Sequence, residues 1–185
     1  MSSVRRWLAS CKMDFRVMYE RLYSMNRPDK ESESKPQIKL EFKIGEKDFN
    51  VAGESALKVK KTLQQLGLKT EVVRNVAIIV YEAVMNVVIH ANYGQLKVII
   101  VPEKVVVLTE DTGIGIPDLE LAMKEGYSTA TNEIREMGFG AGMGLPNIKQ
   151  YSHKLNIKSQ VGVGTVLEAI VYLSFKDKIV KAGVV

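Results

Sequence analysis

The amino-acid sequence predicts an α+β two-layer sandwich, in which a mixed β-sheet carries helices on one face. The main observation is the order of its segments. Strand-like alternation and helical spacing follow one another as strand, helices, strands, loop, helix and strands. The loop, residues 125–144, is rich in glycine and is expected to be irregular and lid-like. The composition supports a folded domain, since 46% of the 185 residues are hydrophobic and 25% are charged.

Residues 1–25 are expected to form an amphipathic helix. Its apolar residues alternate spacings of four and three over about three heptads. They are Val4, Leu8, Cys11, Phe15, Met18, Leu22 and Met25. This pattern is typical of a helix that forms a dimer or docks on a partner, and equally of a helix packed on its own domain. Six basic and two acidic residues within 1–28 leave attachment to a membrane surface as a third interpretation.

The globular domain is expected to cover residues 37–185, because the polar, proline-containing segment 26–36 has the composition of a linker. Residues 37–44 alternate as a strand does. Residues 52–66 have helical spacing and stop at Gly67. A long apolar helix is predicted over 70–91, with Thr70 as its N-cap.

The second half of the domain is predicted to contain two hairpins. Residues 95–101 and 105–109 are β-branched strands joined at Pro102-Glu103-Lys104. A short helix over 118–124 and a helix over 145–155 follow, the latter with a proline in its first turn. Residues 155–160 and 164–175 form the last hairpin.

Composition excludes several classes of function. The single cysteine, Cys11, excludes a disulfide framework and a multi-cysteine zinc site. The net charge of +5 is scattered, and aromatic residues make up only 7%, so a nucleic-acid partner is not expected. The longest apolar run has six residues, from Val76 to Tyr81. We therefore expect no membrane span and no membrane partner, and a cytoplasmic protein.

Glycine clustering is the strongest compositional feature, because seven of the fourteen glycines lie between Gly113 and Gly144. One cluster, Asp111-Thr112-Gly113-Ile114-Gly115, follows a strand. The other, residues 138–144, leads into a helix, whose free amides and dipole favour a phosphate. Neither cluster matches a Walker or a Rossmann motif. Taken alone, each is also compatible with a flexible connection.

The long helix carries a third feature. Glu82, Asn86 and His90 are four residues apart and share one face of an otherwise apolar helix. One interpretation is a hydrogen-bonded pair at the helix surface. The functional interpretation is a carboxylate for proton transfer beside an amide oxygen that binds Mg2+.

Together these motifs resemble the GHKL superfamily of ATP-binding domains, the fold shared by gyrase, the large heat-shock chaperones, histidine kinases and MutL. The resemblance covers residues 37–175 and implies the Bergerat, or histidine-kinase-like, ATPase fold with a glycine-rich ATP lid. Glu82, Asn86 and His90 match the N box. Residues 111–115 and 138–144 match the two glycine boxes, and Gly162-x-Gly164-Thr165 matches the last motif.

The resemblance implies a role for each matching residue. Asp111 would accept a hydrogen bond from the adenine amino group, assisted by Thr165. Asn86 would hold Mg2+, and Glu82 would be the catalytic base. Arg135 would reach the phosphates when the lid closes. The implied ATP contacts are Asn86, His90, Asp111, Gly113, Gly115, Ser128, Thr129, Gly138, Gly140, Gly142, Met143, Gly144, Leu145 and Thr165.

Finer motifs narrow the family. Residues 82–91 are similar to the bacterial anti-sigma-factor serine kinases. Residues 125–129 and 140–146 are similar to the stressosome switch kinases, which phosphorylate STAS-domain proteins. The resemblance implies a serine/threonine kinase that acts on a STAS-type protein with ATP and Mg2+. A sigma factor or a phosphatase is a further possible partner. The N-terminal helix is not part of the family domain, and its heptad spacing makes it a possible site of homodimerisation.

Two alternatives remain open at this point. One is an ATP-gated switch that binds a sigma factor or a phosphatase without transferring phosphate. The other is an ATPase subunit of a larger complex. A sensor histidine kinase is disfavoured, because both histidines, His90 and His153, lie inside the ATP-binding domain. The lid also departs from many anti-sigma kinases, since Ala130-Thr131 stands where they have a lysine.

Overall fold

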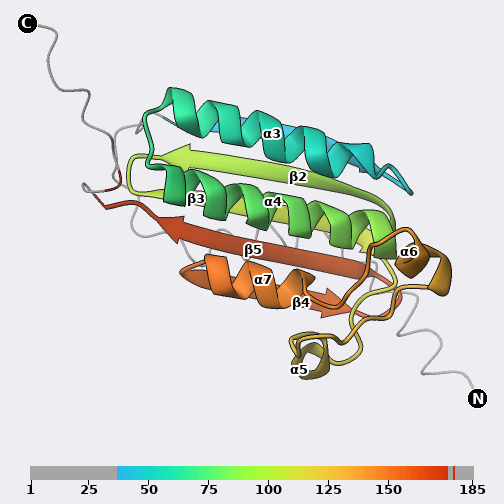
Figure 1. Cartoon of the computed structure of the whole chain (residues 1–185). Coiled ribbons are helices and arrows are strands. Elements are labelled where there is room, and N and C mark those ends of the chain that lie inside the picture. The colour runs from blue at the N-terminus through green and yellow to red at the C-terminus, as the bar shows by residue number, and fades with distance from the viewer. Residues whose placement is uncertain (1–36, 175–176, 178–185) are drawn as a thin grey trace, which may run out of the picture. The chain divides into compact units, whose positions relative to one another are not determined.

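The computed structural model describes residues 37–174 and 177. The predicted N-terminal helix and linker lie outside these residues. Five strands form one sheet in the order β1-β2-β3-β5-β4. Helices α3, α4 and α7 cover one face of it (Figure 1). The strands are β1 (Ile38–Gly45), β2 (Ala91–Val101), β3 (Lys104–Gly113), β4 (Lys154–Gln160) and β5 (Gly164–Tyr172). The helices are α3 (Asn50–Gln65), α4 (Thr70–His90), α5 (Leu119–Ala122), α6 (Asn132–Glu136) and α7 (Gly144–Tyr151).

The predicted α+β two-layer architecture is confirmed, but the prediction of a mixed sheet is wrong. Every neighbouring pair of strands is antiparallel. The reason is the position of β5. Strands β3 and β4 run in the same direction, yet the tight hairpin between β4 and β5 places β5 between them. No parallel pair therefore forms.

Helix α4 is the central element of the core. Ten of its 21 residues are buried, and it packs between α3, α7 and the sheet. Within the described residues, α4 is also a helix long and apolar enough to cross a membrane by length and composition. Its packing accounts for this apolar character, because its ten buried residues belong to the core formed with α3, α7 and the sheet.

The helix boundaries differ slightly from the predicted ones. Helix α3 ends as expected, with Gly67 in the left-handed region at a φ of 74°. The prediction of Thr70 as the N-cap of α4 is wrong. Lys69 takes that position, because its carbonyl accepts the first helical hydrogen bond, from the amide of Val73 (3.0 Å). No side chain caps this end of the helix.

Strands β2 and β3 are longer than predicted, and the extra residues shape the site. Strand β2 begins directly after α4, and its register with β3 shifts between Ala91 and Gly94. A side chain at Gly94 would stand 2.5 Å from Val87 Cγ1 and 2.8 Å from the carbonyl of Glu110. Gly94 therefore lets the end of β3, with Asp111, lie against α4.

The connection between β3 and α7 is partly helical. Asp118 caps α5 by accepting the amide of Leu121 (2.9 Å), in line with the short helix predicted there. Helix α6 was not predicted, since it has only five residues inside the glycine-rich loop. Its N-cap is Thr131, whose hydroxyl accepts the amide of Ile134 (3.5 Å). Helix α7 ends at Tyr151, so Leu155 belongs to β4.

Candidate functional site

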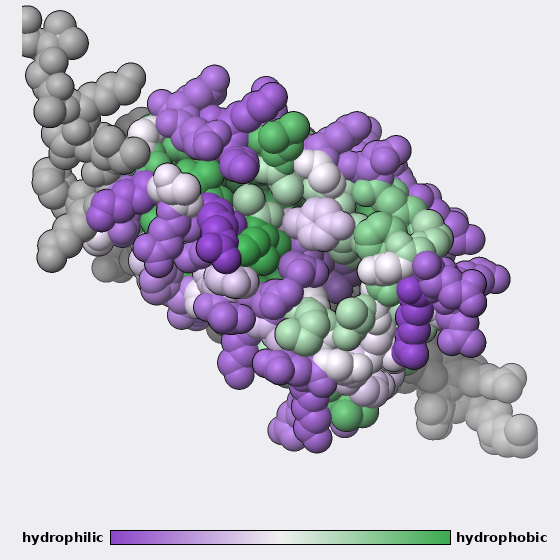
Figure 2. All heavy atoms as spheres, in the orientation of Figure 1, coloured by the Kyte–Doolittle hydropathy of each residue, from purple (hydrophilic) through white to green (hydrophobic). Residues whose placement is uncertain are grey.

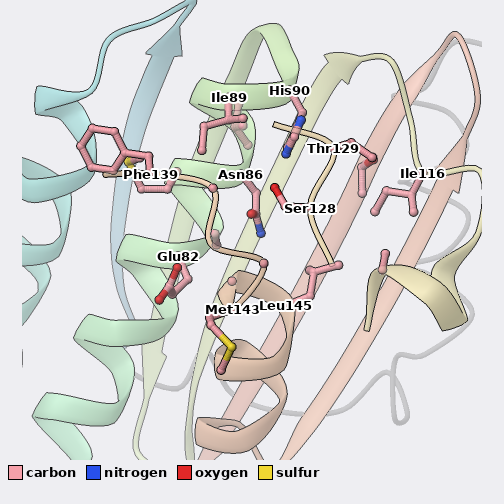
Figure 3. A pocket seen from close by; sticks show the side chains of 18 of the residues that line it. Glu82, Asn86, Ile89, His90, Ile116, Ser128, Thr129, Phe139, Met143 and Leu145 are labelled. Atoms are coloured by element: carbon pink, nitrogen blue, oxygen red, sulfur yellow. The ribbon is translucent and has the colours of Figure 1, made fainter. Parts of the chain in front are cut away.

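A pocket of about 340 Å3 lies between α4, the end of β3, the lid segment 126–144 and the start of α7. All the predicted site residues except Gly113 and Arg135 line it. Figure 3 shows Glu82, Asn86 and His90 on successive turns of α4, with Met143 and Leu145 near the start of α7. The chain thus brings together residues that are far apart in sequence.

The α4 residues define a long axis for the pocket. Glu82 and His90 are eight positions apart, which corresponds to about 12 Å along a helix. The backbone carbonyl of His90 accepts the amide of Ile114 (3.3 Å), so the His90 end lies beside the loop that follows β3. Burial lowers the pKa of His90, and its imidazole is therefore neutral at neutral pH.

Asn86 lies in the middle of this axis and faces the start of α7. Its Nδ2 atom is buried and has no hydrogen-bond partner among the described residues. A side chain at Gly144 would stand 2.8 Å from Asn86 Oδ1, so a larger residue there would displace the Asn86 side chain. An unpartnered buried amide is costly in a folded protein, which favours a ligand at this position.

Asp111 lies at the end of the pocket that is remote from Glu82. Its Oδ1 atom accepts hydrogen bonds from the amides of Gly113 (2.8 Å) and Thr165 (3.2 Å). Its Oδ2 atom accepts none within the described part of the chain. Burial raises the pKa of Asp111, the two amides act in the opposite direction, and neighbouring Glu110 raises it further. The free oxygen of this half-buried carboxylate is thus an acceptor available to a hydrogen-bond donor in the pocket.

Gly164 holds β5 against Asp111. Its φ is 144°, and a side chain there would collide with the backbone carbonyl of Asp111. This contact brings the amide of Thr165 within reach of the carboxylate. The structure places Gly113 differently from the prediction, because it lies behind Asp111 and supports the carboxylate through its amide. Gly113 does not line the pocket.

Ser159 organises the same end of the pocket, although no sequence pattern indicated this residue. Its hydroxyl oxygen accepts the amide of Ile116 (2.7 Å) and lies 2.8 Å from the hydroxyl of Thr165. It also donates to the carbonyl of Gly164 (3.2 Å). Ser159 therefore connects the loop after β3 to the β4–β5 hairpin. Its partners lie up to 43 residues away, beyond the reach of local sequence patterns.

The lid is held together by its own backbone and side chains. Gly142 accepts the amide of Gly126 (3.1 Å), and a side chain at Gly142, whose φ is 75°, would collide with the Gly126–Tyr127 backbone. The Ser128 hydroxyl accepts the amide of Ala130 (3.1 Å). Arg135 donates to the Ser128 carbonyl (2.8 Å), so its guanidinium braces the lid in this structure.

Phe139 attaches the lid to α3. No sequence pattern indicated a role for this residue. Its ring stacks on that of Phe49, with centroids 5.1 Å apart and planes 12° apart. In Figure 3, Phe139 lies on the side of α4 that faces α3. Figure 2 shows hydrophobic residues gathered beside α6 and the start of α3, and hydrophilic ones along α3. We call the Phe49–Phe139 pair the lid latch.

The lid latch should restrain the motion of the lid. An aromatic pair contributes about 0.5–1.5 kcal/mol beyond burial, so Phe139→Ala should raise amide exchange over residues 126–144 by about 2–10-fold. Hydrogen-exchange mass spectrometry measures this. Tyr93→Ala, which removes an exposed ring outside the latch, is the control. Unchanged exchange in Phe139→Ala would show that the stacking does not restrain the lid.

The N-terminus of α7 faces the pocket next to Asn86. No side chain caps it, its first turn holds no acidic residue, and its first helical hydrogen bond runs from the amide of Asn147 to the Met143 carbonyl (2.9 Å). The amides of Gly144 and Leu145 are therefore left for a ligand, while Pro146 has none. The free amides and the helix dipole together favour an anion here.

Comparison with known proteins decides the family. The sequence profile of the family described as histidine kinase-, DNA gyrase B-, and HSP90-like ATPases matches residues 71–177, more than half of the chain. The chain belongs to this family. The finding confirms the predicted superfamily, and it identifies the ligand of the histidine kinase-like ATPase domain as ATP.

Two curated relatives agree with the finer prediction. The chain is 28% identical over 118 residues to the serine/threonine-protein kinase RsbT of Bacillus subtilis, covering 62% of this chain and 83% of RsbT. It is 31% identical over 114 residues to the anti-sigma F factor of Caldanaerobacter subterraneus subsp. tengcongensis, covering 59% and 76%. They confirm the predicted class, a serine/threonine kinase of the anti-sigma regulatory type.

A solved structure supports the fold alone. The SiaB–SiaC complex from Pseudomonas aeruginosa contains a chain that superposes with a TM-score of 0.52 at 15% identity, covering 86% of this chain and 98% of that one. It shows that the arrangement of sheet and helices found here occurs in a solved structure.

Proposed function

We propose that this chain transfers the γ-phosphate of ATP to a serine or threonine hydroxyl of a STAS-type regulatory protein. The observation that carries the proposal is the position of Glu82. Its carboxylate lies in the ATP pocket beside α7, at the end of the pocket remote from Asp111. A proton acceptor at this position can contact the hydroxyl of the protein substrate, whereas Asp111 can contact the adenine ring of ATP.

Adenine recognition falls to Asp111. The free Oδ2 atom accepts a hydrogen bond from the adenine amino group, while guanine presents a carbonyl oxygen there and is rejected. The amides of Gly113 and Thr165 fix the carboxylate through its other oxygen. Ser159 fixes the hydroxyl of Thr165, which also contacts the adenine.

Phosphate binding falls to the start of α7 and to Asn86. The amides of Gly144 and Leu145 bind phosphate oxygens at the positive end of the helix dipole. Asn86 would hold Mg2+ through its Oδ1 atom, since an amide oxygen is a ligand that this cation accepts, while its buried and unpartnered Nδ2 is a donor suited to a phosphate oxygen. A magnesium ion held there would supply positive charge to the phosphate oxygens.

The transfer step then needs one proton acceptor. As the hydroxyl oxygen of the substrate forms its bond to the γ-phosphorus, the bond from this phosphorus to the leaving oxygen of ADP breaks. The hydroxyl proton passes to the carboxylate of Glu82. Positioning and neutralisation of charge supply most of the rate in such reactions. The lid with Ser128, Thr129 and Gly138–Met143 would exclude water from the phosphates.

The acceptor and the location complete the proposal. A STAS-type acceptor is supported by the similarity of residues 82–91, 125–129 and 140–146 to the anti-sigma and switch kinases, and we propose the cytoplasm as the location of the reaction. The relative named anti-sigma F factor favours a second candidate, an ATP-gated binder of a sigma factor. Both candidates use the same pocket and differ in whether phosphate leaves it.

We further propose that residues 1–25 mediate homodimerisation and that ATP binding needs only residues 37–185. Deletion of residues 1–36 should leave the affinity for ATP within about twofold and lower the number of chains per particle. Isothermal titration and light scattering measure the two quantities. An unchanged number of chains would contradict dimerisation through this segment.

Labelling with γ-labelled Mg-ATP tests the function. The purified chain is added to a lysate of its own cells, and wild type is compared with Glu82→Gln. We expect one labelled small protein whose label is acid-stable and base-labile, as for phosphoserine or phosphothreonine, and which is absent with the variant. Free labelled phosphate alone would indicate an ATPase. Bound ATP without turnover would indicate the binding switch.

A further inference from the structure

The carboxylate of Glu82 has a partner on another helix. Asn147 Nδ2 donates a hydrogen bond to Glu82 Oε1 at 2.8 Å, and both side chains are half-buried. The two residues are 65 positions apart in sequence and meet because α4 and α7 pack together. No other described side chain donates a hydrogen bond to Glu82, and no ion pair to it forms within residues 37–174 and 177.

Local helix chemistry does not explain Asn147. It is the fourth residue of α7, and asparagine is a poor residue for a helix interior unless its side chain caps the helix. This side chain is not a cap, because α7 has no side-chain cap and the backbone amide of Asn147 already donates to Met143. Its amide instead points across to α4, where the base lies.

The chemistry of the contact suits a base. We propose that Asn147 is a positioning residue that holds Glu82 by one oxygen and leaves Oε2 free to accept the proton of the acceptor hydroxyl. A neutral amide orients the carboxylate without adding the positive charge that a lysine or an arginine would bring. Fixing one rotamer of a flexible glutamate also keeps the base in line with the acceptor. This inference rests on the proposed role of Glu82.

The contact also connects the base to the phosphate end of the pocket. Helix α7 carries the free amides at Gly144 and Leu145, and Asn147 follows within one turn. Gly144 approaches Asn86 and Asn147 bonds Glu82, so α7 contacts two of the functional residues of α4. The base is therefore aligned when the start of α7 is in place.

Kinetics of two substitutions test this role. We measure single-turnover transfer from Mg-ATP to a purified STAS-domain protein of the same cells. Asn147→Ala should lower the rate constant for transfer by about 10–100-fold and leave the KM for ATP within twofold. Aspartate has the same size as asparagine but would set a second carboxylate against Glu82, so Asn147→Asp should lower the rate constant for transfer at least as much. Gln150→Ala, which removes an exposed amide on the same helix, is the control and should keep wild-type kinetics.

A double-mutant cycle separates positioning from a structural role. If Asn147 acts through Glu82, Asn147→Ala should change the rate by less than twofold in a Glu82→Gln background. Equal losses in both backgrounds, or a raised KM for ATP with an unchanged rate constant, would overturn the inference. If Glu82→Gln lowered the rate constant for transfer and Asn147→Ala did not, the positioning role of Asn147 would be overturned, while Glu82 would remain the base. If Glu82→Gln kept the wild-type rate constant, the proposed role of Glu82 as the base would itself be overturned.

Discussion

Glu82→Gln should lower γ-phosphate transfer by about 10²–10⁴-fold while leaving the affinity for ATP within about twofold. Glutamine keeps the size of the side chain and an oxygen that can still accept from Asn147, but it cannot take up the proton of the acceptor hydroxyl. Single-turnover transfer and isothermal titration measure the two quantities. The combination distinguishes a lost base from a lost ligand contact.

The control for this prediction lies on the same helix. Glu71 is exposed in the first turn of α4 and does not line the pocket, so Glu71→Gln makes the same chemical change outside the site. If Glu71→Gln and Glu82→Gln lowered transfer equally, the effect would belong to the loss of a carboxylate on α4 in general. If Glu82→Gln transferred phosphate at the wild-type rate, Glu82 would not be the base.

The second large effect is expected at the adenine end. Asp111→Asn should weaken ATP binding by about 10²–10³-fold, because the amide sets a donor against the adenine amino group. Asparagine can still accept the amides of Gly113 and Thr165 through its oxygen. Inosine triphosphate has a carbonyl oxygen in place of that amino group. Its affinity for the variant should therefore be higher than its affinity for the wild type. A uniform loss for both nucleotides would contradict direct recognition by Asp111.

The raised pKa of Asp111 adds a dependence on pH. Burial moves it above the ordinary aspartate value of 3.8, so the carboxylate takes up a proton at a higher pH than an exposed one does. ATP binding needs the acceptor and should be lost as the pH falls through this raised pKa. The Asn variant should lack this step. Titrations of affinity against pH for both proteins measure the difference.

The raised pKa of Asp111 affects folding stability in the opposite direction from ATP binding: stability falls as the pH rises. A folded state that raises the pKa of a carboxyl binds its proton more tightly than the unfolded chain does. The contribution of Asp111 to stability is therefore present below 3.8 and is lost as the pH rises through the folded value. At neutral pH, Asp111→Asn should not lower the melting temperature, so its loss of ATP binding would not arise from unfolding.

The sequence predicted much of this fold because its patterns are local. Helix α4 has an unbroken helical pattern, and β1 alternates in a regular way. The glycine clusters marked the strand end and the helix start that meet in the pocket. Errors arose where distant segments decide the outcome. The mixed sheet was predicted because the position of β5 between β3 and β4 depends on packing, which no local pattern contains.

In the candidate site, too, local patterns predicted some residues, whereas contacts between distant segments determine others. Glu82, Asn86 and His90 could be grouped from their spacing on one helix, and Asp111 from its place before two glycines. Asn147, Ser159 and Phe139 could not, because each acts through a contact to a segment far away in sequence. Helix α6 was missed because five residues carry too little periodicity to stand out from a glycine-rich loop.

A structure of the chain with Mg2+ and a non-hydrolysable ATP analogue would show how ATP is oriented in the pocket. We expect the adenine amino group at Asp111 Oδ2, the phosphates at the amides of Gly144 and Leu145, and the γ-phosphate facing Glu82. A nucleotide bound in the reverse direction, or one whose γ-phosphate lies away from Glu82, would show that Glu82 is not the base and Asp111 not the adenine acceptor.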